Sequence, residues 1–171
     1  MYQPDQIDWK IIALLNQDGR MSSAEISRQL EDVSARTVTN RIDVLIENGI
    51  INIRSIVNPE MIGYTVLADV FIQVKPGTVR SVADQLAKLP EISYLVCATG
   101  DTDIIISIRA FSISELYNFV IEKVGKIPDV SHTKTYLLPL NFKSTADWMP
   151  PNLIHNNKDK ETEDSHPKLG E

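Results

Sequence analysis

The polar residues between positions 34 and 41 have side chains that can read base edges in duplex DNA. An arginine can donate two hydrogen bonds to guanine, an asparagine can pair with adenine, and a threonine methyl can contact a thymine methyl. Val38, Ile42 and Leu45 recur at helical spacing and are expected to face a core. The residues turned away from that face are Arg36, Thr37, Thr39 and Asn40. The segment has the chemistry of a DNA-reading helix, although a solvated polar helix face would show the same pattern.

Neighbouring polar residues are suited to phosphate oxygens rather than to bases. Hydrogen bonds to phosphate fix the position of a protein on a duplex without reading its sequence. Arg41 flanks the core face, so both a phosphate contact and a role in supporting the fold are open to it. The candidate DNA-contacting residues are Ser22, Ser23, Arg28, Ser34, Arg36, Thr37, Thr39, Asn40, Arg41 and Arg54.

The charge balance is unusual for a DNA-binding protein. The chain has 17 Lys and Arg against 23 Asp and Glu, a formal net charge of −6. Residues 1–60 hold six basic and nine acidic side chains, a balance of −3. Because phosphate contacts supply much of the affinity for DNA, this balance argues against DNA binding. The clustering of Arg28, Arg36, Arg41 and Arg54 argues for a local basic face.

The composition excludes several other classes of protein. Cys97 is the single cysteine, and His132, His155 and His166 lie far apart, so neither an intramolecular disulfide nor a zinc motif can be assembled. No apolar run approaches the ~18–20 residues of a membrane span, and the N-terminus does not resemble a signal peptide. We expect a cytoplasmic protein without a metal. Cys97 is expected to be buried, His132 to be structural or solvated, and Trp148 to pack against the second domain.

Three short helices are predicted in the first fifty residues. Apolar residues at helical spacing predict the first helix between Asp5 and Asp18. Ser22 and Glu25 have capping-box spacing at the start of the second helix. Ser34 is a favourable N-cap for the third helix. The last two helices are joined by a short turn, which predicts a helix-turn-helix.

Residues 50–57 alternate apolar and polar side chains, which predicts a strand or a small wing after the third helix. The second half of the chain predicts strands and helices in the order β-α-β-β-α-β, the order of ferredoxin-like domains. The expected strands are residues 64–74, 92–98, 104–110 and 130–142, and the expected helices are residues 78–89 and 112–124. Pro139 predicts an edge or a bulge near the end of the last strand.

The predicted fold class is therefore α+β, an N-terminal winged helix-turn-helix plus a C-terminal ferredoxin-like βαββαβ domain. Both helices of such a domain cover one face of the sheet. The other face is expected to be apolar and bare, so that it pairs with a second copy in a homodimer. The expected domains are a DNA-binding domain at 1–57, a linker at 58–63, a second domain at 64–148 and a disordered charged tail at 149–171.

Several stretches in this order resemble the Lrp/AsnC family, the leucine-responsive and asparagine-responsive regulators of bacteria and archaea. The resemblance covers roughly residues 5–143. Its carriers are Ile7-Asp8, Gly19-Arg20-Met21-Ser22, Thr37-Val38, Arg41-Ile42, Gly49-Ile50-Ile51, Thr99-Gly100-Asp101-Thr102-Asp103, Ile127-Pro128-Asp129-Val130 and Thr135-Tyr136. Two positions depart from the family pattern. Asp32 stands where a glycine is usual in the helix-turn-helix turn, and is expected to take the left-handed conformation. Thr102 stands where an aromatic residue is usual.

The resemblance implies a transcription regulator that binds duplex DNA and assembles as a homodimer, and as a tetramer or octamer. It also implies an amino-acid effector near the glycine-aspartate loop. A carboxylate there would bind the ligand's ammonium group, and backbone N–H groups would bind its carboxylate. The expected effector-binding residues are Gly100, Asp101, Thr102, Asp103, Thr133 and Thr135. The same loop would equally serve as an ordinary β-turn.

Two alternatives of other classes remain open at this point. Siroheme decarboxylases share the two-domain architecture, but the histidine-rich motifs of those enzymes have no counterpart beside His132. No catalytic triad, catalytic carboxylate pair or phosphate-binding glycine loop is recognisable. The other alternative is a sensing or assembly protein that has lost DNA binding, which the acidic N-terminal balance would favour. A dimeric regulator predicts palindromic DNA sites with half-sites separated by whole helical turns.

Overall fold

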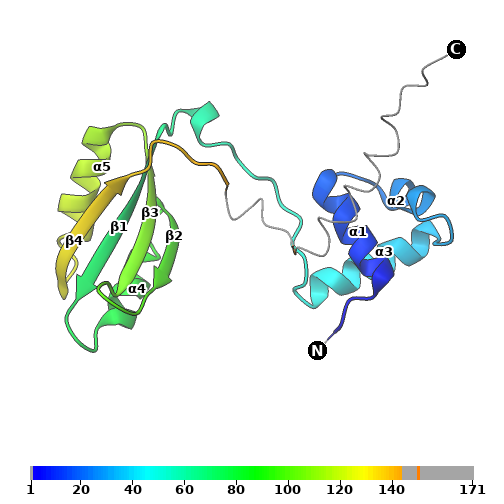
Figure 1. The fold of residues 1–171 in the computed structure, drawn as a ribbon, viewed down its shortest axis with the longest axis horizontal. Helices are drawn as coiled ribbons and strands as arrows, with labels where there is room; N and C mark the ends of the chain where they lie inside the picture. Colours follow the sequence, from blue (N-terminus) through cyan, green and yellow to red (C-terminus); the bar gives the residue numbers. More distant parts are fainter. Residues whose placement is uncertain (1, 144–149, 151–171) are drawn as a thin grey trace, which may run out of the picture. The chain divides into compact units, whose positions relative to one another are not determined.

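The structure is a computed structural model that describes residues 2–143 and Pro150. These residues divide into two compact units, one reaching Ile56 and the other beginning at Val57 (Figure 1). Trp148 and the charged tail predicted at 149–171 fall almost entirely outside the described residues. The domain bounds expected from the sequence therefore stay predictions.

The N-terminal unit contains three helices, α1 (Gln6–Gln17), α2 (Ser23–Gln29) and α3 (Ala35–Glu47), as the sequence predicts. Each helix begins after a residue whose side chain accepts a hydrogen bond from the first turn. Ser22 and Ser34 do so as expected, and Ser22 forms a reciprocal capping box with Glu25. Asp5 caps α1 in the same reciprocal way with Asp8, a box that the sequence reading did not anticipate.

The three helices are held together by a small apolar core. Ile11 from α1, Ile26 from α2 and Val38 from α3 are wholly buried against one another. Ile12 and Leu45 form a second contact between α1 and α3. Because each helix contributes one stripe to this core, the opposite stripe of α3 is left in solvent.

Two predictions about the N-terminal unit are wrong. The left-handed residue in the α2–α3 turn is Glu31, with φ 57°, rather than Asp32. Of the two alternatives predicted for residues 50–57, a strand or a small wing, the strand does not form, and the chain has no regular secondary structure from Ile51 to Asn58. A strand needs a neighbour for its backbone hydrogen bonds, and this stretch has no such partner among the described residues.

The C-terminal unit begins with a short 3₁₀ turn, η1 (Glu60–Ile62), inside the segment that was predicted as linker. The Asn58 side chain accepts a hydrogen bond from the Glu60 backbone N–H at 3.1 Å. Gly63 follows with φ 96°, and a Cβ at this position would lie 3.2 Å from the Phe111 ring. Phe111 also contacts Tyr64, with 4.0 Å between ring centroids. This turn is therefore packed against the rest of the C-terminal unit.

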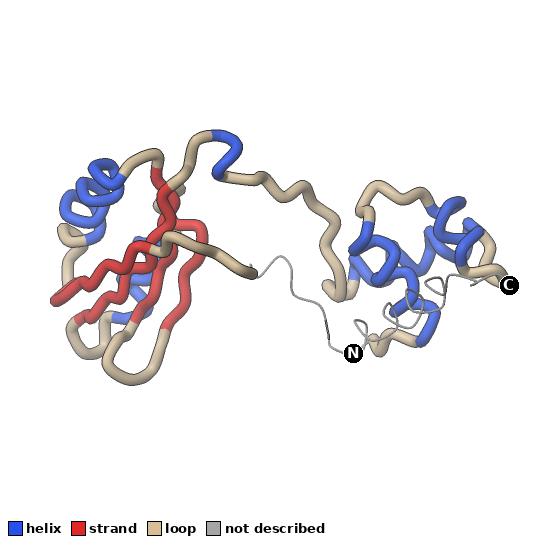
Figure 2. Tube along the Cα trace, turned by 45° about the horizontal axis from the view of Figure 1, so that its top comes forward, coloured by secondary structure: helices blue, strands red, loops and turns tan. Residues whose placement is uncertain are grey.

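The rest of the C-terminal unit has the predicted β-α-β-β-α-β order. Its elements are β1 (Val66–Val74), α4 (Val79–Leu86), β2 (Ile92–Cys97), β3 (Ile104–Ala110), α5 (Ile113–Phe119) with the π-helical turn η2 (Val120–Val124), and β4 (Val130–Leu137). The antiparallel sheet has the order β2-β3-β1-β4, so β1 and β3 are central and β2 and β4 are edges (labelled in Figure 1; the strands are red in Figure 2). This is the strand order of a ferredoxin-like domain. The last strand ends at Leu137, before Pro139, and is shorter than predicted.

One face of the sheet is covered and the other is open. Val70 and Ile72 of β1 and Ile104 and Ile106 of β3 are wholly buried in a core that includes Leu86 of α4 and residues of α5. The opposite face carries Phe71 and Tyr136, whose rings meet edge to face at 5.2 Å. It also carries an Asp69–Ser107 hydrogen bond of 2.6 Å. The open face is thus bare as expected, but it is mixed in polarity rather than apolar.

The prediction that Cys97 is buried is also wrong. Cys97 is exposed because it ends β2, an edge strand with no neighbour on its outer side. His132, on the other edge strand, is exposed, in agreement with the solvated alternative.

Candidate nucleic-acid interface and sensing loop

The outward stripe of α3 is the surface best placed to read DNA. Arg36 and Asn40 are exposed on it, one turn apart, on the opposite side of the helix from the buried Val38 and Leu45. The same stripe continues into Asp43 and Glu47, which are also exposed. On this stripe, side chains that can donate hydrogen bonds therefore lie only in the N-terminal half of α3. In helix-turn-helix proteins the N-terminal residues of the second helix contact base edges.

Thr39 and Ser23 connect α3 to α2. The Thr39 hydroxyl lies 2.8 Å from Ser23 Oγ and 3.1 Å from the Ala35 carbonyl oxygen. Both serines that open the helices are also engaged. Ser22 Oγ lies 2.6 Å from a Glu25 carboxylate oxygen, and Ser34 Oγ lies 2.9 Å from Thr37 Oγ1. The Thr39–Ser23 bond joins the two helices, whereas the Ser22 and Ser34 contacts lie within the first turns of α2 and α3.

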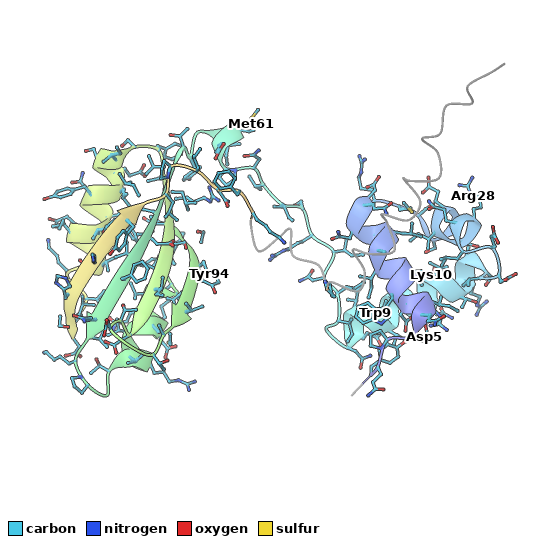
Figure 3. All side chains as sticks on the ribbon, in the orientation of Figure 1. Asp5, Trp9, Lys10, Arg28, Met61 and Tyr94 are labelled. Atoms are coloured by element: carbon cyan, nitrogen blue, oxygen red, sulfur yellow. The ribbon has the colours of Figure 1, made fainter. Side chains whose placement is uncertain are left out.

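The other arginines divide into two kinds. Arg28 and Arg54 are exposed, and within residues 2–143 the only hydrogen bond from either guanidinium is a local one, from Arg28 Nε to the Ala24 carbonyl at 3.3 Å. Figure 3 places Arg28 on α2. Arg41 is different, because Nη1 lies 2.7 Å from Asp5 Oδ2 and 2.9 Å from Asp8 Oδ1. Of the two roles left open for Arg41, the structure shows the supporting one.

The sequence reading missed the carboxylates that receive Arg41. Asp8 is wholly buried, and Asp5 caps α1 (Figure 3). Their three-residue spacing is the signal that would have found them, since it is capping-box spacing. The Asp8 backbone N–H and then the Arg41 guanidinium hold the pKa of the Asp5 carboxyl below its usual value.

In the C-terminal unit, the Gly100–Asp103 loop is anchored to the end of β1. The Asp103 backbone N–H donates to the Ile72 carbonyl at 3.0 Å, and Thr102 Oγ1 lies 3.1 Å from the same oxygen. The Asp103 carboxylate accepts the Val74 backbone N–H at 2.9 Å. Thr102 and Asp103 therefore have structural partners already.

Asp101 is the member of the loop whose side chain remains open to solvent. Its backbone carbonyl accepts a 2.7 Å hydrogen bond from Gln73 Nε2, while its carboxylate is exposed and has no hydrogen-bond partner within residues 2–143. Thr133 lies across β1 from this loop, since it pairs with Ile72 in the β1–β4 ladder. Thr135 pairs with Val70 and lies farther along the strand. The sheet thus brings the loop and Thr133 to one end of β1.

Comparison with known proteins matches both units. The model of the Lrp/AsnC ligand binding domain matches residues 67–147, and that of a winged helix-turn-helix DNA-binding domain matches residues 4–52. An uncharacterised HTH-type transcriptional regulator of Pyrococcus abyssi is 40% identical over 137 residues, which are 80% of this chain and 86% of that protein.

The chain belongs to the Lrp/AsnC family of transcriptional regulators.

Solved structures agree with the membership in this family. E. coli AsnC is 28% identical, with a TM-score of 0.79, and the match covers 84% of this chain and 97% of AsnC. A transcriptional regulator of Neisseria meningitidis, solved in complex with L-Met, has a TM-score of 0.80 at 21% identity; 89% of this chain and 99% of that chain are covered.

Membership in the Lrp/AsnC family settles the function class. The chain is a DNA-binding transcriptional regulator with a ligand-binding domain, and neither the enzyme alternative nor the alternative without DNA binding is needed. The family is oligomeric. None of the described helices is both long and apolar enough to cross a membrane.

Proposed function

We propose that this regulator reads its DNA site with the N-terminal half of α3 in the major groove, and that Arg36 and Asn40 contact base edges. The observation that carries the proposal is the position of these two exposed residues directly opposite the buried stripe of α3. Arginine favours guanine and asparagine favours adenine. Thr37 and Thr39 flank this pair and would contact the same groove or its edge.

Phosphate contacts fall to the residues around the reading helix. Arg28 and Arg54 carry charges that the described residues do not neutralise. Ser22, Ser23 and Ser34 stand at or beside the starts of α2 and α3, where backbone N–H groups favour phosphate. Arg41 is left out of this set because two carboxylates already engage it. Arg28 and Arg54 would form a local basic surface, which makes a negative net charge compatible with DNA binding.

The ligand proposed for the C-terminal unit is an amino acid. The exposed Asp101 carboxylate would bind its ammonium group, and the hydroxyls of Thr133 and Thr135 would add hydrogen bonds. Gly100 has φ 129° and leaves open space where a side chain would stand, so the ligand can approach the loop backbone. The L-Met complex of the Neisseria regulator supports this class of ligand.

Self-association is proposed through the open face of the sheet, which would form a homodimer and present two α3 helices to one duplex. Further assembly into tetramers or octamers and a cytoplasmic location are parts of the same proposal. A two-fold protein favours a palindromic DNA site whose half-sites are about 10 base pairs apart or a multiple of that spacing.

The experiment is a footprint and gel-shift titration of the full chain, first on DNA upstream of its own gene and then on sequences selected from a random pool. The proposal expects protected patches spaced by helical turns. It expects Arg36→Ala and Asn40→Ala to weaken binding at particular base pairs, by about 1–3 kcal/mol each. Lys10→Ala, an exposed charge on α1, is the control. Equal loss on every sequence for both reading variants would overturn the assignment to bases.

A further inference from the structure

Asp8 is a charged residue with no exposed surface, the single such residue among those described. Its carboxylate nevertheless accepts three hydrogen bonds, each from a different residue of the N-terminal unit. Oδ1 accepts from Arg41 Nη1 of α3 at 2.9 Å. Oδ2 accepts from the Tyr2 hydroxyl at 2.7 Å and from the Asp5 backbone N–H at 2.9 Å. One carboxylate therefore joins the N-terminal segment, the start of α1 and the middle of α3.

Arg41 reaches this carboxylate from the core-facing side of α3. It lies between Val38 and Leu45 at spacings of three and four residues, and both of those side chains are wholly buried. The Arg41 side chain is 26% exposed. The guanidinium is thus directed toward α1, away from the stripe that carries Arg36 and Asn40.

The apolar contacts between α1 and α3 set only coarsely how α3 is turned about its own axis. Burial of Ile11, Ile12, Val38 and Leu45 is favourable over a range of rotations, because the hydrophobic effect is non-directional. A charge-assisted hydrogen bond between Arg41 and two carboxylates is directional and short. Each residue step in a helix is about 100°, so even a modest rotation would move Arg36 relative to a base.

We infer that Asp8 and Arg41 are positioning residues for DNA recognition, which set the rotation of the reading helix without touching DNA. Asp5 and Tyr2 complete the arrangement by holding the Asp8 carboxylate and the Arg41 guanidinium in place. The inference rests on the proposed reading role of α3. It assigns to Arg41 a contribution to sequence discrimination and none to phosphate binding.

The salt dependence of binding separates the two roles. A phosphate contact contributes to the slope of log affinity against log salt, about 0.9 per neutralised phosphate. Full-length Arg41→Gln and Asp8→Asn proteins are compared with Arg36→Gln and with Asp84→Asn, an exposed control on α4. Affinities are measured for the selected DNA site and for a scrambled duplex over a series of salt concentrations, at a temperature where circular dichroism shows each protein to be folded.

The expected result for Arg41→Gln and Asp8→Asn is a loss of preference for the selected site of about tenfold, comparable to one mismatched base pair, with an unchanged slope on the scrambled duplex. Asp84→Asn should behave as the unaltered protein. A slope reduced by about 0.9 in Arg41→Gln would identify a phosphate contact instead. Folded variants that keep the full preference would show that the pair serves stability alone. Either outcome overturns the inference.

Milder variants keep the test decisive if a buried unpaired charge prevents folding. Tyr2→Phe and Asp5→Asn each remove one contact of the arrangement and leave the Asp8–Arg41 bond in place. Residual dipolar couplings on these proteins report the orientation of α3 relative to α1 without DNA. A changed orientation supports the inference, whereas an unchanged one contradicts the role assigned to Tyr2 and Asp5 in holding the Asp8–Arg41 pair. Failure of the proposed reading role would appear separately, as a lack of site preference in the unaltered protein.

Discussion

The Thr39 hydroxyl lies 2.8 Å from the Ser23 hydroxyl, and this contact joins the reading helix to the first residue of α2. Replacing Thr39 by valine keeps the shape of the side chain and removes the bond. We expect the N-terminal unit to lose about 1 kcal/mol of unfolding free energy, a typical value for such a bond. The measurement is urea unfolding followed by Trp9 fluorescence in a Trp148→Phe background. No loss in Thr39→Val would show that the hydroxyl pair is not formed in solution.

Glu31 occupies the left-handed region in the α2–α3 turn, with φ 57°. A side chain is strained in that conformation and glycine is not, although glycine also gains entropy in the unfolded chain. Glu31→Gly is therefore expected to raise the unfolding free energy by about 0.5–1 kcal/mol. Asp32→Gly is the matched control at the position where the resemblance placed the glycine, and it should be destabilising or neutral. Reversal of the two results would contradict the turn geometry.

Acid should destabilise the N-terminal unit. Bonds from the Asp8 backbone N–H and Arg41 lower the pKa of Asp5, and the hydroxyl and backbone N–H of Ser22 lower the pKa of Glu25. Their folded-state pKa values lie below the unfolded ones of about 4, so this stabilisation is complete above pH ~4–5 and is lost as pH falls through the folded-state values. Thermal unfolding measured from about pH 2 to about pH 7 covers both sides of the ordinary carboxyl pKa of about 4 and therefore measures the effect. A double variant, Asp5→Asn with Glu25→Gln, should show a flatter profile; an unchanged profile would assign the acid sensitivity to other groups.

The acidic residues on the reading stripe should weaken binding to any DNA sequence. Asp43 and Glu47 are exposed beyond Asn40, where they would face phosphate oxygens. Asp43→Asn is expected to raise the affinity for a scrambled duplex about two- to fivefold at low salt, and the gain should disappear at high salt as screening grows. Gel shifts at two salt concentrations measure this, with Glu122→Gln of the other unit as the control. A gain that persists at high salt would have to arise from something other than charge.

Asp101 and Asp103 should differ in what their replacement does. Asp103 holds the Val74 backbone N–H, so Asp103→Ala is expected to lower the stability of the C-terminal unit by about 1–3 kcal/mol. Asp101→Ala should leave stability unchanged and abolish the response to an amino acid. Calorimetric titration with each of the common amino acids, on both variants and the unaltered protein, separates the two effects. Full ligand binding by Asp101→Ala would exclude its carboxylate as the ammonium partner.

The features that could be predicted from the sequence are those that depend on residues close together in the chain. Ser22 with Glu25, and Ser34, predicted helix starts because a capping residue acts on the next few backbone groups. Alternating apolar residues predicted β3 to the residue, since every second side chain of that central strand is buried. The same pattern failed at residues 50–57, where alternation is present but no neighbouring strand is available to pair with it.

Features that depend on tertiary contacts could not be predicted in this way. The partners of Arg41 lie 33 and 36 residues away, and nothing local to Arg41 distinguishes a buried ion pair from a phosphate contact. The exposure of Cys97 depends on its place at the end of the edge strand β2, which the local residue pattern around Cys97 does not show. The sequence identified Thr102 and Asp103 as a group with Asp101. That the first two anchor the loop to β1 while the Asp101 carboxylate stays exposed depends on hydrogen bonds to β1.

The 3₁₀ turn that precedes β1 determines where the protein can be divided into fragments. The Asn58 side chain accepts the Glu60 backbone N–H, the Pro59 carbonyl accepts the Tyr64 backbone N–H at 2.9 Å, and the Tyr64 ring packs on Phe111. Residues 51–57, by contrast, have no regular structure. A limited digest should therefore cut within 51–57 and leave the turn on the larger product. A recombinant ligand-binding fragment that starts at Asn58 would keep these contacts. A fragment that starts at Tyr64 would keep the Tyr64 ring but lose the 3₁₀ turn and the Pro59 carbonyl that hold Tyr64 in place.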